Sequence, residues 1–191
     1  MVVSVLLVGV GGQGIISAAQ VLAEAALSAG YDVKTSEVHG MAQRGGSVQS
    51  MVRWGQEVFS PLIPEGEADY ILAFEMLEGL RHVHYLAPRG VMIVNRVRID
   101  PLPVLAGTAE YPAGIDRLLA EKLPDTMVLS AADIGAQAGN RRSAGAAMLG
   151  ALSKRLEFSP DVWERAIRRN VPKKALDANL RAFELALCLP R

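Results

Sequence analysis

Cysteine is almost absent from this sequence, and its scarcity excludes several classes of protein. The 191 residues contain a single cysteine, Cys188, in an apolar stretch near the C-terminus. A disulfide within the chain is impossible, and a cytoplasmic location is the natural expectation. A protein-bound iron–sulfur cluster normally needs about four cysteines, so this chain cannot hold one by itself.

An excess of charge of either sign is also missing. Lys and Arg together number 20, as do Asp and Glu, which gives a formal net charge of zero. Binding to nucleic acid would need a basic excess or a basic stripe, so no nucleic-acid partner is expected. One local basic cluster is interleaved with acidic residues and is expected to be a solvated helix face, which we favour over the alternative of a phosphate-binding patch. It consists of Arg165, Arg168, Arg169, Lys173 and Lys174.

Long apolar runs and metal-binding spacings are lacking too. No stretch is apolar for the length of a membrane span, and because Met1 leads directly into a predicted strand, we expect no signal peptide. The three histidines, His39, His82 and His84, show no zinc-ligand spacing, so we predict no metal site. His82 and His84 are expected to be exposed on or beside a helix.

The first informative stretch is a predicted strand that enters a glycine-rich turn and then a helix. Residues 5–8 are apolar, and glycines occupy positions 9, 11, 12 and 14. Residues 15–29 have helical composition, with apolar side chains recurring on one side. Glycines let the backbone approach a ligand closely, and a helix N-terminus attracts anions. The stretch therefore predicts an anion site or a polar backbone contact.

The second informative stretch is SEVHGMAQRGGSVQSMV at residues 36–52. Glu37 lies 23 residues after Gly14 (37 − 14), where a dinucleotide-binding fold places the acidic residue that grips the ribose. However, residues 39–46 lack helical periodicity, and residues 47–54 alternate as a strand does. We therefore predict a strand at 33–38, a functional loop, a partly antiparallel strand at 47–54, a turn and a short strand at 58–59.

The rest of the chain predicts a mainly parallel α/β fold. Residues 70–74 and 91–95 read as buried strands joined by a helix over 75–86 and a turn at 88–90. Strands at 108–111 and 126–129, helices at 114–123 and 141–156 and a helix begun by Ser159-Pro160 are expected to follow. The last helix is expected to dock on the core through Leu176, Leu180, Phe183 and Leu187. The predicted fold is one α/β domain spanning residues 1–191, with three layers, a mostly parallel central sheet with an antiparallel portion, and a helical C-terminal part.

Several motifs together resemble a known family. GVGGQG at residues 9–14 and SEVHGMAQRGGSVQSMVRWG at residues 36–55 resemble the gamma subunit of 2-oxoacid:ferredoxin oxidoreductases of the pyruvate, ketoisovalerate and indolepyruvate types. The chain looks closest to the beta subunit of indolepyruvate ferredoxin oxidoreductase. ADYILAFE at 68–75 and LGAL at 149–152 extend the resemblance. The chain departs from the family where Gly145 replaces a frequent asparagine and Arg141 a frequent proline.

The resemblance implies a subunit of an enzyme that oxidatively decarboxylates a 2-oxoacid to an acyl-CoA and reduces ferredoxin. It implies thiamine diphosphate, magnesium and iron–sulfur clusters in partner subunits, with coenzyme A as co-substrate. The thiamine-binding GDG…N motif is absent from this sequence. We therefore predict no catalytic residue here and an inactive isolated chain. The isolated subunit would expose the face that its partner subunits normally cover, and this face would allow two copies to form a homodimer.

Within that frame, the loops at residues 11–14 and 37–47 are predicted to lie together and to face the catalytic subunit. Arg44 beside two glycines suits an anion, either a coenzyme A phosphate or an acidic side chain of the partner. The predicted site comprises Gly11, Gly12, Gln13, Gly14, Glu37, His39, Gln43, Arg44, Gly45, Gly46 and Ser47.

Three alternatives remain open from the residues. In the first, Arg44 pairs internally with Glu37, and the glycines only make turns. In the second, which GxGxxG and Glu37 indicate, the protein is a free-standing NAD- or FAD-binding oxidoreductase. In the third, the protein is a purely structural assembly module with no ligand of its own.

Overall fold

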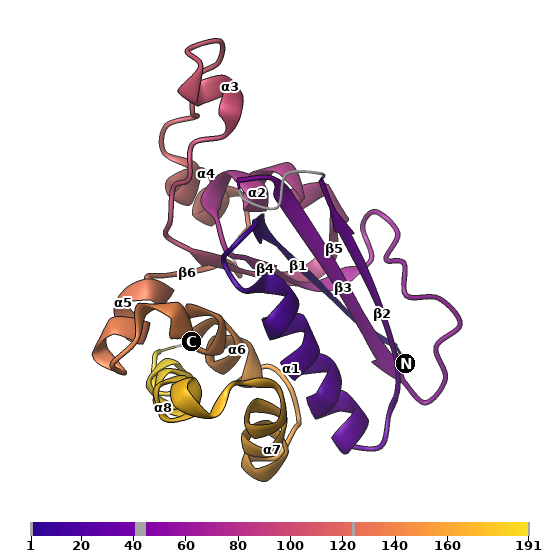
Figure 1. Cartoon of the computed structure of the whole chain (residues 1–191). Coiled ribbons are helices and arrows are strands. Elements are labelled where there is room, and N and C mark those ends of the chain that lie inside the picture. Colours follow the sequence, from indigo (N-terminus) through magenta and orange to yellow (C-terminus); the bar gives the residue numbers. More distant parts are fainter. Residues whose placement is uncertain (1, 41–44, 124, 191) are drawn as a thin grey trace.

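The computed structural model describes residues 2–40, 45–123 and 125–190. At its centre is a six-stranded sheet with the strand order β2-β3-β1-β4-β5-β6. Strand β3 pairs antiparallel with β1 and β2, whereas β1, β4, β5 and β6 pair parallel. This confirms the mostly parallel sheet with an antiparallel portion (Figure 1). The strands are β1 (Val3–Val10), β2 (Asp32–His39), β3 (Ser47–Gly55), β4 (Ala68–Ala73), β5 (Leu86–Asn95) and β6 (Met127–Leu129).

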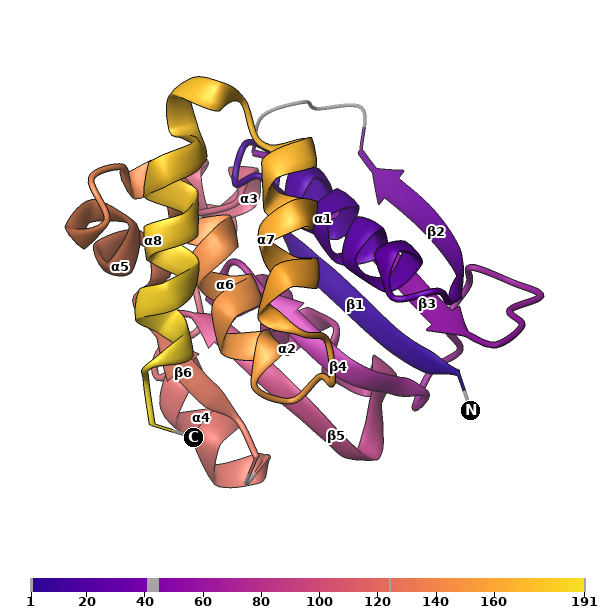
Figure 2. The same cartoon turned by 90° about the horizontal axis from the view of Figure 1, so that it is seen from below.

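One face of the sheet is covered by the first helix and by the C-terminal helices (Figure 2). Val5 and Leu7 of β1 are fully buried on this face, in one core with α1, α6, α7 and α8. These helices are α1 (Ile15–Ser28), α6 (Ala144–Ser153), α7 (Pro160–Asn170) and α8 (Leu176–Leu187). Two connecting elements, α5 (Ala131–Gln137) and the 3-10 turn η2 (Arg141–Ser143), lead into α6, and η3 (Lys173–Ala175) leads into α8.

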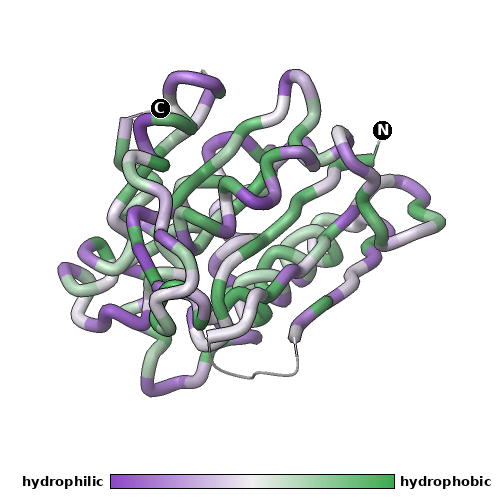
Figure 3. Tube along the Cα trace, turned by 90° about the horizontal axis from the view of Figure 1, so that it is seen from above, coloured by the Kyte–Doolittle hydropathy of each residue, from purple (hydrophilic) through white to green (hydrophobic). Residues whose placement is uncertain are grey.

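The opposite face is covered by shorter helices. Leu6 and Val8 of β1, which alternate with Val5 and Leu7, form a second core with Leu77 and Leu119. These come from α2 (Met76–Arg81) and α4 (Ile115–Lys122). Because β1 is covered on both faces, it is apolar without alternation, and the tube trace is hydrophobic along the central strands (Figure 3). The three-layer arrangement is as predicted.

The small residues of α6 allow a close helix crossing. A Cβ atom placed on Gly150 would lie 2.3 Å from the carbonyl oxygen of Phe183 in α8. Ala182, Phe183 and Ala186 are buried against this surface. The predicted docking of the last helix is therefore confirmed, except at Leu187, which is 42% exposed.

Four local predictions were wrong. The helix over 75–86 ends at Arg81 and is followed by the 3-10 turn η1 (Val83–Tyr85). The turn at 88–90 is part of β5, where Gly90 is needed because a Cβ would lie 2.8 Å from the carbonyl oxygen of Ala68. Residues 58–59 and 108–111 form no strand in the described chain. Instead, the amide of Val58 donates to the Asp32 carboxylate at 2.8 Å.

Candidate functional site

The strand order creates a crevice at the carboxyl ends of β1 and β4. These two strands are adjacent and parallel. The helix after β1 packs on one face of the sheet, whereas the helix after β4 packs on the other. Ligands of open α/β sheets bind at such a switch point. The glycine-rich turn therefore lies where the fold favours a ligand.

The glycines at this edge are required for different structural reasons, which are close packing at Gly9 and a positive φ at Gly12 and Gly14. A Cβ on Gly9 would lie 2.7 Å from Gln13 Oε1 and 2.8 Å from Phe74 Cβ. Gly12 and Gly14 have φ values of 99° and 80°, which favour glycine. Gly14 begins α1, and no described side chain caps the helix. The first backbone amides of α1 are thus available to a ligand.

The Gln13 side chain lies in this crevice and bridges the ends of β1 and β4 by hydrogen bonds. Its Oε1 accepts from the amide of Val10 at 2.8 Å, and its Nε2 donates to the carbonyl of Phe74 at 2.8 Å. The buried Asn95 donates to the same carbonyl at 3.1 Å and accepts from the amide of Ala131 at 2.9 Å. Two amide side chains therefore join the ends of β1, β4, β5 and β6. Gln13, predicted as a ligand contact, makes these hydrogen bonds within the protein.

The structure brings the described ends of the two predicted loops together. The amide of Gly11 donates to the carbonyl of Gly46 at 2.8 Å. His39 and Gly40 line a cavity of about 460 Å³ together with Gly11 and Gly12. Gln43 and Arg44 lie outside the described residues, so their predicted roles stay predictions.

Ser47 joins the loop to a buried carboxylate that the sequence did not single out. Its hydroxyl donates to Glu78 Oε2 at 2.5 Å. Glu78, only 3% exposed, also accepts from Arg81 at 2.6 Å. Gly45, with φ of 78°, precedes this anchor. Gly46 and Ser47 therefore fix the end of the loop against both the glycine turn and α2.

Glu37 lies apart from the glycine turn. It is exposed on β2 and pairs in register with Ser50 of β3, which itself faces Leu7 of β1. In a dinucleotide-binding fold the acidic residue follows a strand that adjoins the first strand. Here β3 separates them, and adjacent strands are about 4.8 Å apart, so Glu37 is about 10 Å from β1 across the sheet. This placement does not suit a ribose contact.

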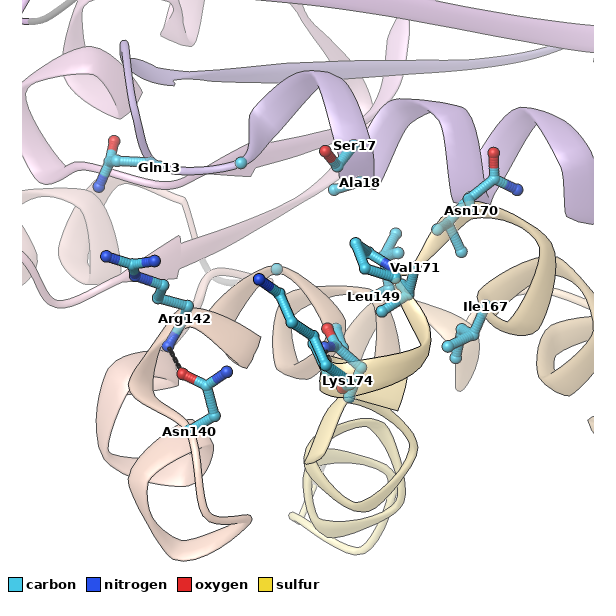
Figure 4. Close-up of a pocket in the computed structure, with 17 residues that line it drawn as sticks. Gln13, Ser17, Ala18, Asn140, Arg142, Leu149, Ile167, Asn170, Val171 and Lys174 are labelled. Carbon is cyan, nitrogen blue, oxygen red and sulfur yellow. Dashed lines mark hydrogen bonds between the residues drawn. The ribbon is translucent and has the colours of Figure 1, made fainter. Parts of the chain in front are cut away.

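Two cations lie in front of α1: Arg142, which no sequence pattern indicated, and Lys174, which belongs to the basic cluster predicted to be a solvated helix face. Arg142 and Lys174 line a cavity of about 380 Å³ with Gly14, Ser17 and Asn140. Within the described chain neither forms an ion pair. Lys174 extends from η3 toward α1, and Arg142 lies beside Gln13 (Figure 4). Because η2 and η3 are distant from the glycines in sequence, no local pattern could reveal this group.

The basic cluster near the C-terminus is therefore divided. Arg168 pairs with Glu164 at 2.7 Å and Arg169 pairs with Glu24, as expected of a solvated helix face. Lys174 instead lines the cavity before α1. Arg142 is held by Asn140, whose Oδ1 accepts from the Arg142 amide at 3.0 Å. Arg142 also lines a neighbouring cavity of about 640 Å³ with Gly12, Gln13 and Arg141.

Other predicted chemistry can be placed as well. The predicted exposure was wrong for His82, whose side chain is only 15% exposed with Nδ1 2.9 Å from the carbonyl oxygen of Glu78, whereas His84 is exposed as predicted. Among the described residues no three His, Cys, Asp or Glu side chains gather as they would around a metal ion. In the same part of the chain, no helix is both long and apolar enough to cross a membrane.

Comparison with known proteins identifies the chain. The sequence pattern of the family described as "Pyruvate ferredoxin/flavodoxin oxidoreductase" matches residues 4–188. "Indolepyruvate oxidoreductase subunit IorB" of Thermococcus kodakarensis is 41% identical over 189 residues, covering 96% of this chain and 94% of the relative. The crystal structure of pyruvate oxidoreductase subunit PORC from Thermotoga maritima is 26% identical with a TM-score of 0.72, covering 97% of this chain and 94% of that one.

A third likeness concerns the fold alone. The 2-oxoglutarate:ferredoxin oxidoreductase of Magnetococcus marinus, a structure with 2-oxoglutarate, coenzyme A and succinyl-CoA bound, has a TM-score of 0.71 at 20% identity. The match covers 97% of this chain and 30% of the Magnetococcus marinus chain.

These comparisons, together with the strand order, bear on one of the three alternatives, the free-standing dinucleotide-binding enzyme. The relatives are subunits of 2-oxoacid oxidoreductases, so the chain is a subunit of a multi-subunit oxidoreductase complex of this kind. A free-standing NAD- or FAD-binding enzyme is not favoured. The chain belongs to the pyruvate ferredoxin/flavodoxin oxidoreductase family.

Proposed function

We propose that this subunit forms part of the coenzyme A site of an indolepyruvate-type 2-oxoacid:ferredoxin oxidoreductase. The observation that carries the proposal is the 41% identity, over 96% of the chain, with a protein named as an indolepyruvate oxidoreductase subunit. Partner subunits would hold thiamine diphosphate, magnesium and the iron–sulfur clusters, and the complex would reduce ferredoxin. This chain would bind and orient coenzyme A, and it would contribute no catalytic group.

The residues in front of α1 fit the phosphate groups of coenzyme A. The uncapped N-terminus of α1 offers backbone amides and a partial positive charge. Arg142 and Lys174 add two full positive charges beside it. When bound, coenzyme A supplies the thiol that accepts the acyl group. The role of this chain is to hold the charged end of the molecule so that the thiol reaches the partner's site.

One departure from the family falls at this site, and the other, Arg141, lines the neighbouring cavity. Gly145, where the family often has an asparagine, lines the same cavity as Arg142. Glycine has no side chain to contact a ligand, so Asn140 and Arg142 are the polar side chains that line this cavity at the start of α6. We expect them to carry the binding that the asparagine would otherwise provide.

The remaining predicted residues are assigned to the same region. Gly11, Gly12 and Gly14 give the backbone its approach to the phosphates, with Gln13 holding the turn in place. Gln43 and Arg44, followed by Gly45, Gly46 and Ser47, would face the phosphates or the partner. Glu37 and His39 belong to the partner-facing side, since Glu37 lies on the exposed edge strand β2.

The proposal is tested on the intact complex, purified anaerobically through a tag on this chain. Arg142→Ala and Lys174→Ala are each expected to raise the KM for coenzyme A about tenfold, because each removes a charge contact of roughly 1.4 kcal/mol. The kcat at saturating coenzyme A should be unchanged, as for a contact made equally in ground and transition states. Arg168→Ala, which removes a paired surface cation, is the matched control.

The outcomes separate the proposal from its rival. An unchanged KM in both variants would remove the phosphate contact from this chain and leave the purely structural module, whose loop variants alter only complex stability. The purified complex also reports its composition. A brown eluate with a larger cysteine-rich chain is expected, whereas a colourless protein arriving alone would contradict the assignment of the cofactors to partners.

A further inference from the structure

One segment stands away from the body of the subunit. Between β5 and α4 the chain leaves the sheet, forms the short helix α3 (Leu102–Leu105), and returns (Figure 1). We call residues 98–112 the arm and its outer part, residues 101–109, the knob. The proposed coenzyme A site does not include it.

The knob is apolar and carries no charge. Its sequence is PLPVLAGTA, nine consecutive residues without an acidic or basic side chain. Leu102 is 77% exposed and Leu105 is 71% exposed. They are three residues apart on one helical turn and so share a face. Paired exposed leucines at the tip of a projection are typical of an interaction site.

The knob has a defined shape before any partner binds. The carbonyl of Pro101 accepts from the amides of Val104 and Leu105 at 2.9 and 3.1 Å. The carbonyl of Pro103 accepts from the Thr108 amide and hydroxyl at 2.9 and 3.0 Å. Gly107, with φ of 72°, lets the chain turn back. Because these polar groups are satisfied internally, binding would order little additional backbone.

The base of the arm is fixed to the end of β4 by a buried carboxylate. Glu75, 1% exposed, accepts from the Tyr111 hydroxyl at 2.6 Å and from the Ile99 amide at 3.2 Å. The guanidinium of Arg98 lies 4.4 Å from the centre of the Tyr111 ring and bonds Asp100 at 2.6 Å. The two chain segments that form the base of the arm are therefore both held in place.

Charged residues surround the base but not the tip. Arg98 and Asp100 precede the knob, and Glu110 follows it. An apolar centre inside a charged rim is the arrangement of a protein–protein interface, in which a few buried anchors carry most of the binding energy. The arm thus has the anatomy of an interface anchor.

We propose that the knob inserts into an apolar groove on another subunit of the same oxidoreductase complex, with Leu102 and Leu105 as the anchors. The chain is a subunit of such a complex, so a partner surface exists. An anionic lipid surface does not fit, because the knob lacks lysine and arginine.

A second copy of this chain fits less well as the occupant. Its own apolar groove, of about 340 Å³, lies between α7 and α8 and is lined by Trp163, Phe183 and Leu187. That groove is also lined by the charged side chains of Glu164, Arg168 and Glu184, to which a knob without charged groups offers no partner.

The first test replaces both anchors. The double variant Leu102→Asp/Leu105→Asp, introduced into the tagged chain and expressed with all subunits of the complex, is expected to bind its partner at least tenfold more weakly. Phe59→Asp is the matched control, because Phe59 is 87% exposed on the loop between β3 and β4. Its assembly should equal that of the wild type. Both isolated variants should keep the wild-type Tm, because the replaced side chains are exposed.

The second test identifies the contact. In a Cys188→Ser background, Leu105→Cys carries a photoreactive maleimide, and the assembled complex is irradiated and analysed by peptide mass spectrometry. We expect a crosslink to a different subunit of the complex. A crosslink only to another copy of this chain, or no crosslink together with normal assembly of the aspartate variant, would overturn the proposal. Neither result depends on whether Arg142 and Lys174 bind coenzyme A.

Discussion

Glu75 and Tyr111 show how one hydrogen-bonded pair holds a long excursion of the chain. Glu75 caps α2 by accepting from the amide of Glu78 at 2.9 Å, and it also accepts from Tyr111 and Ile99. The sequence placed Glu75 only at the start of a helix. Two of its three partners, Ile99 and Tyr111, lie 24 and 36 residues away along the chain, and no local pattern predicts them.

This pair predicts a loss of stability at alkaline pH. Burial, and then the hydrogen bond to Glu75, raise the pKa of Tyr111 above its ordinary value of 10.0. The unfolded chain would therefore release the phenolic proton at a lower pH than the folded chain does. The contribution of Tyr111 to stability is full below pH 10 and declines as the pH rises beyond it.

The measurement is the free energy of urea unfolding between pH 8 and 11. Tyr111→Phe should cost about 1 kcal/mol at pH 8 through the lost hydrogen bond, and should show a shallower decline above pH 10 than the wild type. Tyr70→Phe is a useful comparison, because burial also raises the pKa of Tyr70. Equal alkaline slopes in the wild type and Tyr111→Phe would contradict the assignment.

At the scale of elements, the crossing of α6 and α8 rests on one glycine. A Cβ on Gly150 would approach the Phe183 carbonyl oxygen at 2.3 Å and Ala186 Cβ at 3.0 Å. Both obstacles belong to α8, and a backbone carbonyl cannot rotate away as a side chain can. Gly150→Ala is expected to destabilise the protein by about 1–3 kcal/mol through overpacking.

The same helix offers a matched control for this prediction. A Cβ on Gly145 would meet its nearest neighbours at 3.8 Å, which is ordinary contact. Gly145→Ala should therefore be neutral or stabilise by up to about 1 kcal/mol, since alanine favours the helix. Denaturant unfolding of the two variants is the test. If both gave the same free energy of unfolding, the close crossing would not be a determinant of stability.

The elements that the sequence predicted are those with a local signal. The buried strands at 5–8 and 91–95 and the helix after Gly14 were predicted because apolar runs and glycine turns are local patterns. Gly90 was misread as a turn because the reason for a glycine there is a neighbouring strand. The site divides in the same way, since the glycine turn was predicted but Arg142 and Lys174 were not. Their position depends on how η2 and η3 pack against α1.

At the scale of the whole molecule, the strand order decides what Glu37 can do. The spacing in the sequence from Gly14 to Glu37 agrees with a dinucleotide-binding unit. In the fold, however, β3 runs between β1 and β2, and Gln13 occupies the crevice between β1 and β4. A ribose at the glycine turn would therefore be out of reach of the Glu37 carboxylate. The sequence spacing matches that of a dinucleotide-binding unit, but the strand order places Glu37 too far from the glycine turn to contact a ribose there.

This argument yields a prediction for the isolated chain and for the complex. In isothermal titration the isolated chain should show no saturable binding of NAD or FAD. In the complex, Glu37→Ala should leave the KM for coenzyme A unchanged, whereas Arg142→Ala should raise it, because Arg142 lies before the N-terminus of α1 and Glu37 does not. Saturable dinucleotide binding that Glu37→Ala abolishes would mean that the chain can rearrange to bring β2 to the glycine turn. A higher KM in Glu37→Ala alone would move the coenzyme A site from the α1 terminus to the exposed edge of the sheet.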